Sequence, residues 1–179
     1  MAHRRHAALL VSTLALSPVA GAASMTITQT LLHTLESKGL SAVQARSAAL
    51  VASHHYRSQA LQPILASIKG IPRLPAHYYS HGTLKGRAGT GLARVLTSAF
   101  RNHAGPARVQ SATGAYTHAV AQGAPPQTTG QLLVSALHHG VTAPRLKALV
   151  ANYLRRYKAG ASAQNALHKA KSTLSRYGL

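Results

Sequence analysis

The sequence predicts an all-α protein of short antiparallel helices, arranged as a bundle or as an array of helical hairpins. Apolar residues recur with the helical spacing of three and four in several segments. Glycine followed by a capping Ser or Thr separates these segments. No segment alternates apolar and polar residues over the length of a strand, so no sheet is expected.

Residues 1–22 have the features of a secretory signal peptide. Two arginines near the N-terminus precede an apolar run, Pro18 breaks that run, and the small residues at 20–22 suit a signal peptidase. The run is shorter than the roughly 20 apolar residues that a membrane-spanning helix requires. We therefore expect a periplasmic or secreted protein whose mature chain begins at Ala23; an ordinary buried N-terminal helix is the alternative.

Residues 23–69 and 91–179 form an N-terminal and a C-terminal helical segment, which we expect to belong to one domain. In the second segment, apolar residues follow one face of a helix in consecutive stretches. These stripes consist of Leu92, Val95, Leu96, Ala99 and Phe100; of Val109, Ala112, Tyr116, Ala119 and Val120; of Leu146, Leu149, Val150, Tyr153, Leu154 and Tyr157; and of Leu167, Ala170 and Leu174. Each stripe allows a helix to bury one side against its neighbours.

A short unit recurs between the predicted helices: Gly, a small or apolar residue, Ser or Thr, and then Ala. It occurs at Gly39, Gly140 and Gly160, with a looser copy at Gly123. Glycine can end a helix in the left-handed conformation, and the hydroxyl residue two positions later can cap the next helix. The expected caps are Ser41, which with Gln44 fits a capping box, Thr142 and Ser162. The units are either true repeats or ordinary helix punctuation, and both interpretations give short antiparallel helices.

Residues 70–90 break the helical pattern and predict a long irregular loop between the two helical segments. Such a loop in a compact domain is usually functional or disordered. Its candidate ligand-binding residues are Arg73, His77, Tyr78, Tyr79, His81, Lys85 and Arg87. Tyrosines flanked by cations can stack on bases or sugars while the cations hold phosphates. The alternative is a mobile basic loop whose tyrosines pack back on the helices.

The glycine-rich end of this loop, residues 86–91, matches neither a Walker sequence nor a dinucleotide-binding fingerprint. We interpret it as the turn before a helix that contains Leu92. Free N–H groups at the start of that helix can hold an anion.

The chain contains 20 Lys and Arg but a single acidic residue, which gives a net charge of +19. Its counter-charges must therefore come from outside, and we expect an anionic polymer or surface as the partner: nucleic acid, anionic lipid or an envelope polymer. Cations are densest in the C-terminal third. The candidate polyanion-binding residues there are Arg145, Lys147, Arg155, Arg156, Lys158, Lys169, Lys171 and Arg176.

The same composition argues against an enzyme. Paired-carboxylate catalysis is excluded, and Glu36 is the only side chain that could orient a Ser–His pair. We expect Glu36 to make a local charge contact beside Lys38 instead. Without cysteine, and with almost no carboxylate, no metal site and no cofactor are expected. The histidine doublets at 54–55 and 138–139 are expected on exposed helix faces.

Other interpretations of the charge stay open. Scarcity of acids also suits a structural or chaperone-like envelope protein of an acidic habitat, because native carboxylate pairs are lost as pH falls. An enzyme of unknown class is the third interpretation. Cations gathered on one face favour binding, whereas an even spread favours the habitat account. An alanine-rich core buries little area per residue, so a bound anion or a second copy of the chain is expected to add stability.

Overall fold

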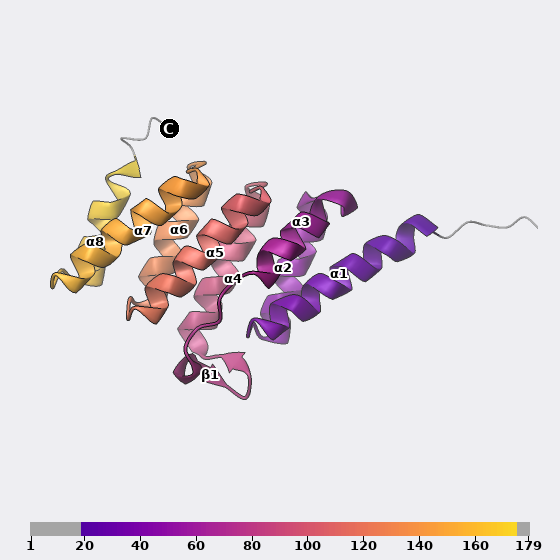
Figure 1. The fold of residues 1–179 in the computed structure, drawn as a ribbon, viewed down its shortest axis with the longest axis horizontal. Coiled ribbons are helices and arrows are strands. Elements are labelled where there is room, and N and C mark those ends of the chain that lie inside the picture. The colour runs from indigo at the N-terminus through magenta and orange to yellow at the C-terminus, as the bar shows by residue number, and fades with distance from the viewer. Residues whose placement is uncertain (1–18, 175–179) are drawn as a thin grey trace, which may run out of the picture.

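The computed structural model describes residues 19–174 and shows two layers of antiparallel helices with one small β-hairpin (Figure 1). The helices are α1 (Val19–Ser37), α2 (Ala42–His55), α3 (Ser58–Lys69), α4 (Gly86–Arg101), α5 (Pro106–Ala121), α6 (Pro126–His138), α7 (Ala143–Lys158) and α8 (Ala163–Lys171). Between α3 and α4, a 3-10 turn, η1 (Ala76–Tyr78), leads into β1 (Tyr79–Ser80) and β2 (Thr83–Leu84). The fold is all-α, as the sequence predicts.

The helices form an array in which odd-numbered and even-numbered helices occupy separate layers. The helices α1, α3, α5 and α7 pack side by side in one layer, and α2, α4, α6 and α8 pack side by side in the other. Figure 1 shows this row running from the indigo α1 to the yellow α8, with α6 and α4 behind α7 and α5. Because each helix packs on neighbours close in sequence, the array presents one long exposed surface on each layer.

The same turn joins five pairs of consecutive helices. In the first, Gly39 has φ +95°, its N–H donates to the Glu36 carbonyl at 2.8 Å, and the Leu40 N–H donates to the Leu35 carbonyl at 3.2 Å. This pair of bonds is the Schellman motif, which satisfies carbonyls at a helix C-terminus. The positive-φ residues of the five turns are Gly39, His103, Gly123, Gly140 and Gly160.

The turns include every predicted glycine unit and one unit that the sequence pattern misses. His103 adopts φ +47° where the other turns have glycine. His103 and Gly140 lie 37 residues apart, and so do Gly123 and Gly160. Hairpins of equal length favour the repeat interpretation over simple punctuation.

Two of the three predicted caps are present. Ser41 Oγ accepts from the Gln44 N–H at 3.3 Å and Gln44 Oε1 accepts from the Ser41 N–H at 3.1 Å, which completes the capping box. Ser162 caps α8. The predicted Thr142 cap is wrong, because its side chain makes no capping bond. Pro144 occupies the second position of α7 and has no N–H, so one of the two donors that a cap uses is missing.

The predicted apolar stripes form the core, and α4 and α6 approach closely through glycines. Tyr116 of α5 is fully buried, and its hydroxyl donates to the Ala88 carbonyl of α4 at 2.8 Å. Its ring passes over Gly91, where a Cβ atom would collide with the phenol, and Gly130 of α6 lies against Gly91. Burial raises the pKa of Tyr116 well above its ordinary value.

The predicted loop lies between α3 and α4, over residues 70–85, and it contains a small hairpin that the sequence pattern does not predict. Tyr79 pairs with Leu84 and Ser80 with Thr83 in an antiparallel hairpin. The glycine-rich residues 86–91 belong to α4 rather than to a turn before it. A Cβ on Gly89 would lie 3.1 Å from the Leu84 carbonyl oxygen, so glycine here permits close packing inside a helix.

Most of the expected signal peptide, residues 1–18, lies outside the described part of the chain. Helix α1 begins at Val19 and continues through the expected cleavage site before Ala23. Cleavage there would leave Ala23–Ser37 of the helix, so export remains a prediction. Among residues 19–174, no helix is both long and apolar enough to cross a membrane.

Candidate functional site

The residues of the 70–85 loop mainly fasten the loop to the helices. Arg73 donates to the Ser37 carbonyl at 2.7 Å, and the Tyr78 hydroxyl donates to the Val120 carbonyl at 2.9 Å. The ring of Tyr79 fills the space beside Gly39. These contacts therefore hold the loop in place, and the rings of both tyrosines are half-buried.

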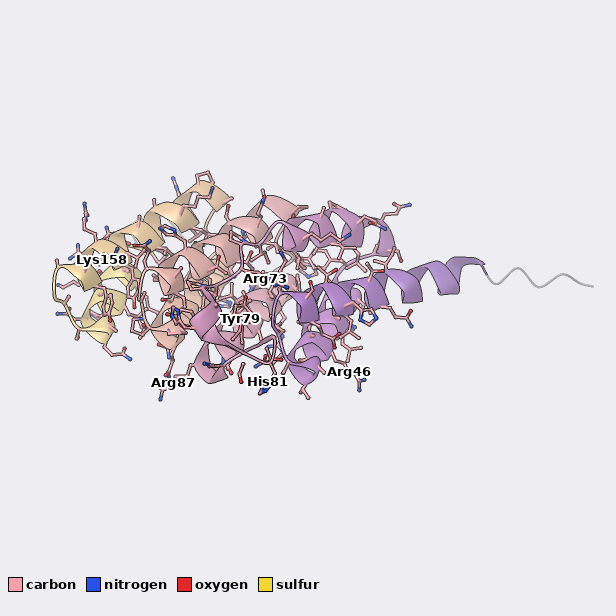
Figure 2. The ribbon with its side chains drawn as sticks, turned by 60° about the horizontal axis from the view of Figure 1, so that its bottom comes forward. Arg46, Arg73, Tyr79, His81, Arg87 and Lys158 are labelled. Carbon is pink, nitrogen blue, oxygen red and sulfur yellow. The ribbon has the colours of Figure 1, made fainter. Side chains whose placement is uncertain are left out.

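The remaining loop candidates do not form a common site. His77 packs against Tyr78 with ring centroids 4.2 Å apart. His81, Lys85 and Arg87 are exposed, and His81 sits at the tip of the hairpin with φ +48°. Figure 2 shows Arg73, Tyr79, His81 and Arg87 on the side of the molecule that holds the hairpin.

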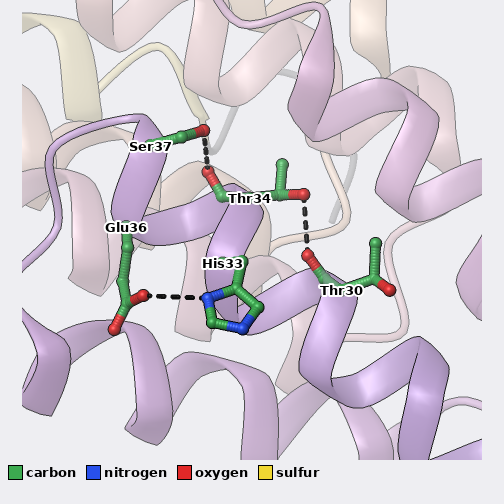
Figure 3. A network of polar contacts seen from close by, with 5 residues as sticks. All are labelled: Thr30, His33, Thr34, Glu36 and Ser37. Carbon is green, nitrogen blue, oxygen red and sulfur yellow. Dashed lines mark hydrogen bonds and ion pairs between the residues drawn. The ribbon is translucent and has the colours of Figure 1, made fainter.

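Glu36 does not contact Lys38, contrary to the sequence-based expectation. Glu36 Oε2 lies 3.4 Å from His33 Nδ1 one turn earlier on α1, beside the local bonds of Thr34 and Ser37 to backbone carbonyls (Figure 3). Lys38 instead donates to the carbonyls at the end of α3, at 2.6 Å and 2.7 Å. Burial and the nearby Arg73 lower the pKa of Lys38.

The described C-terminal cations lie on α7 and α8 and have different neighbours. Lys158 donates to Gln122 Oε1 at 2.6 Å beside the turn between α5 and α6. Lys147 lines a hollow between α5 and α7 in the odd-numbered layer. Arg156 donates to Asn152 Oδ1 at 2.9 Å. Lys147 and Lys158 thus lie toward α5, whereas Arg156 bonds within α7 and lies beside α8.

The other members of this set are also dispersed. Lys169 shares a shallow hollow between α7 and α8 with Arg156, whereas Lys171 faces the even-numbered layer. Arg145 and Arg155 are exposed on α7. The remaining member, Arg176, lies outside the described residues. The assignment of these cations to polyanion binding therefore stays a prediction.

Two adjoining hollows form a groove across all four even-numbered helices. The first lies over α2, α4 and α6 and has a volume of about 650 Å3; the second lies over α4, α6 and α8 and has about 570 Å3. Arg94, Val134 and His138 line both. The groove is lined by Val43, Gln44, Ser47, Thr90, Ala93, Arg94, Thr97, Ser98, Arg101, Asn102, Gly130, Gln131, Val134, Ser135, His138, Gln164, Leu167 and Lys171.

The lining of the groove combines cations, neutral hydrogen-bonding groups and apolar surface. Arg94, Arg101 and Lys171 are its permanent cations, and all three are exposed. Glu36, the only acidic residue of the chain, lies on α1 in the other layer. The cations of the groove therefore have no side-chain carboxylate of this protein as a partner, and they favour an anion from outside.

Helix α4 adds a regular row of arginines to this surface. Arg87, Arg94 and Arg101 are exposed and follow one another at intervals of seven residues. Seven residues are two helical turns, so successive arginines lie about 10 Å apart along the same side of the helix. Of these three arginines, only Arg87 is a site candidate from the sequence; the heptad spacing of all three is the signal that could have identified the row.

A histidine cluster borders the groove at the C-terminal end of α2. The ring centroids of His54 and His55 lie 5.3 Å apart, and those of His55 and His103 lie 5.0 Å apart. Partial burial, followed by the charges of His103, His54 and Arg101, lowers the pKa of His55. Among the described residues, no three His or Glu side chains are grouped as a metal ion would require.

The structure confirms that the histidines lie at the surface. All ten histidines beyond residue 22 are described; His55 is half-buried, and the others are exposed. Of the four histidines in the two doublets, His54, His138 and His139 are exposed as expected.

The depressed pKa of His55 predicts a defined pH effect on stability. The unfolded chain binds this proton more readily than the folded chain, so stability is lost as pH falls through the ordinary histidine value of about 6.5. We expect His55→Gln to show a shallower decline in melting temperature between pH 8 and pH 5 than the parent protein. His118→Gln, which removes an exposed histidine outside the cluster, is the control. Parallel curves for the parent and His55→Gln would refute the effect.

Comparisons of this chain with protein-family models, with curated proteins and with solved structures find no match. Its function is therefore inferred from the geometry and charge of its own surface.

Proposed function

We propose that this protein is an exported binding protein that holds an anionic chain in the groove across α2, α4, α6 and α8. The supporting observation is the groove itself, whose two hollows share lining residues and span four helices, and whose cations have no side-chain carboxylate as a partner. Neighbouring helix axes lie about 8–10 Å apart, so the groove is about 27 Å long. That length suits an extended polymer better than a small molecule.

Binding would rest on electrostatic attraction followed by close contact in the groove. The net charge of +19 attracts any polyanion and raises its rate of encounter. Arg94 and His138 line both hollows, so they stand where a chain would pass from one hollow to the other. Release of counterions from the polymer makes such binding weaker as salt rises.

The dispersed C-terminal cations support a second candidate function for this protein, one that does not need all of its cations to bind a ligand. Lys147 lies on the odd-numbered layer and Lys171 on the even-numbered layer, so these cations do not define one site. That spread suits a structural or chaperone-like protein of an acidic envelope, whose charge reflects its habitat. The two proposals differ in what happens when only the cations of the groove are removed.

The test compares two variants that each lose two charges. Fluorescently labelled polyphosphate is titrated with the parent protein, with Arg94→Gln/Arg101→Gln and with Arg155→Gln/Arg156→Gln at several salt concentrations. Each lost contact with a polyanion reduces the slope of log Kd against log salt by up to about 0.9. We expect the first variant to lose more than about one unit of slope, and the second variant less than half of that.

The sequence pattern alone favours the opposite order, with the α7 arginines dominant. Equal losses for the two variants would support charge spread by habitat over a localised site. Polyphosphate binding that is absent at low salt, or indifferent to salt, would refute the proposed function.

A further inference from the structure

We infer that the anionic chain bound by the groove is an acidic peptide segment in extended conformation, rather than a nucleic acid. This inference rests on the proposed function and names its ligand class. The reasons are the lack of aromatic platforms, the low density of cations, and the amide and apolar groups between them.

The groove lacks the tyrosine and phenylalanine rings that commonly stack on single-stranded nucleic acids. No Tyr or Phe is among its lining residues. The hydroxyls of Tyr56, Tyr78 and Tyr116 donate to backbone carbonyls, and that of Tyr153 is paired with a threonine hydroxyl. Proteins that bind single strands stack successive bases on exposed aromatic rings, and the imidazole of His138 is the only aromatic ring among the lining residues of this groove.

The cations in the groove are too sparse for a phosphate backbone. A nucleic-acid strand bears one charge per about 3.4 Å of helix axis, so a 27 Å groove would face about eight phosphates. Arg94, Arg101 and Lys171 supply three permanent charges over the same length. An extended peptide rises about 3.3 Å per residue, so about eight residues would fit, and two or three carboxylates among them would match the cations.

Neutral groups between the cations are suited to a peptide backbone. Gln131 and Gln164 line the second hollow from α6 and α8, and within residues 19–174 neither side chain makes a hydrogen bond. Each carboxamide can donate to a peptide carbonyl and accept from a peptide N–H. A phosphate or sugar backbone has no such alternation of donors and acceptors.

The apolar surface in the groove requires that the peptide also carry apolar side chains. Val43 is 80% exposed, and Val134 and Leu167 lie in the floor of the hollows. Successive side chains of an extended peptide point in opposite directions. A peptide that places apolar residues against this floor and carboxylates beside Arg94 and Arg101 satisfies both surfaces, since guanidinium groups bind carboxylates in a bidentate manner.

The test compares three labelled probes on the full chain by fluorescence anisotropy. They are a peptide of about ten residues in which three glutamates alternate with apolar and hydroxyl residues, the same peptide with glutamine for each glutamate, and oligothymidylate of about ten nucleotides. We expect the acidic peptide to bind about tenfold tighter than either of the other probes at moderate salt.

A matched pair of variants separates recognition of a peptide from attraction of charge. Gln131→Ala/Gln164→Ala should weaken binding of the acidic peptide about fivefold and leave polyphosphate binding unchanged. Gln59→Ala/Gln62→Ala, which removes two exposed glutamines of α3 in the other layer, should change neither.

Tighter binding of oligothymidylate than of the acidic peptide would overturn the peptide assignment and leave the proposed function standing. A peptide affinity that stays unchanged in Gln131→Ala/Gln164→Ala would have the same two consequences. No binding of any of these anions at low salt would overturn both.

Discussion

Replacement of Gly39 by Ala should destabilise this protein by about 2–5 kcal/mol. Gly39 has φ +95°, which costs a residue with a Cβ atom about 1–2 kcal/mol. Its Cβ would also lie 2.5 Å from the ring of Tyr79 and 2.9 Å from Leu84 Cγ. Those side chains belong to the β-hairpin, whose Leu84 N–H donates to the Gly39 carbonyl at 2.7 Å. The substitution therefore strains the first turn and displaces the hairpin.

Substitutions at three other glycines separate the backbone strain from the steric collision. Gly160→Ala has the strain without the collision, because φ is +93° and nothing lies within 4 Å of the Cβ position. Gly91→Ala has the collision, with Tyr116, without a positive φ. Gly114→Ala has neither and should stabilise α5 by about 0.5–1 kcal/mol.

Urea unfolding of the four variants is the measurement. We expect Gly39→Ala to lose the most stability, Gly160→Ala and Gly91→Ala to lose about 1–3 kcal/mol each, and Gly114→Ala to gain. A Gly39→Ala variant no less stable than Gly160→Ala would show that the hairpin does not pack on the first turn.

Replacement of Val134 by Trp should reduce the affinity for an acidic chain at least about tenfold, or about 1.4 kcal/mol. Val134 lines both hollows of the groove, so an indole there would occupy the passage between them. The substitution leaves the net charge unchanged, so the general attraction for polyanions remains. Affinity for polyphosphate and for the acidic peptide is measured by anisotropy, and the melting temperature shows whether the fold is intact.

Ala148→Trp is the control, because Ala148 is exposed on α7 near the C-terminal cations. We expect it to bind both anions like the parent protein. Unchanged affinity in Val134→Trp, with the protein folded, would mean that the ligand does not lie in the groove.

Much of the helical architecture could be predicted because its causes are local in sequence. The stripe of Leu92, Val95 and Leu96 reports directly which side of α4 is buried. Glycines at Gly140 and Gly160 mark helix ends, since glycine tolerates the left-handed conformation better than other residues. These signals predict the helices, their turns and the hairpin arrangement.

Other features could not be predicted because their causes lie in tertiary contacts. His103 takes the left-handed position of a turn without being glycine. Glycines in residues 86–91 resemble loop residues, yet they allow a helix to pack against Tyr116 and Leu84. The sequence pattern cannot distinguish a glycine that bends the chain from one that makes room for a neighbour.

The candidate site was the least predictable part. A run of cations such as Arg155 and Arg156 is conspicuous in the sequence, but helix periodicity sends its members to different surfaces. Arg94, Arg101 and Lys171 are isolated in the sequence and meet only because α4, α6 and α8 pack side by side. Grooves between repeats depend on which helices stack, and no local pattern contains that information.

The absence of cysteine permits a direct map of where the ligand lies. Single cysteines can replace Ser47, Thr97 and Ser135 in the groove, and Gln110 and Ala148 outside it. The measurement is the rate at which each thiol reacts with a maleimide, with and without a saturating amount of the acidic peptide. We expect the peptide to slow the reaction at all three positions in the groove and at neither position outside it. Protection at position 148, or none at positions 47, 97 and 135, would contradict the claim that this protein holds an anionic chain across its even-numbered helices.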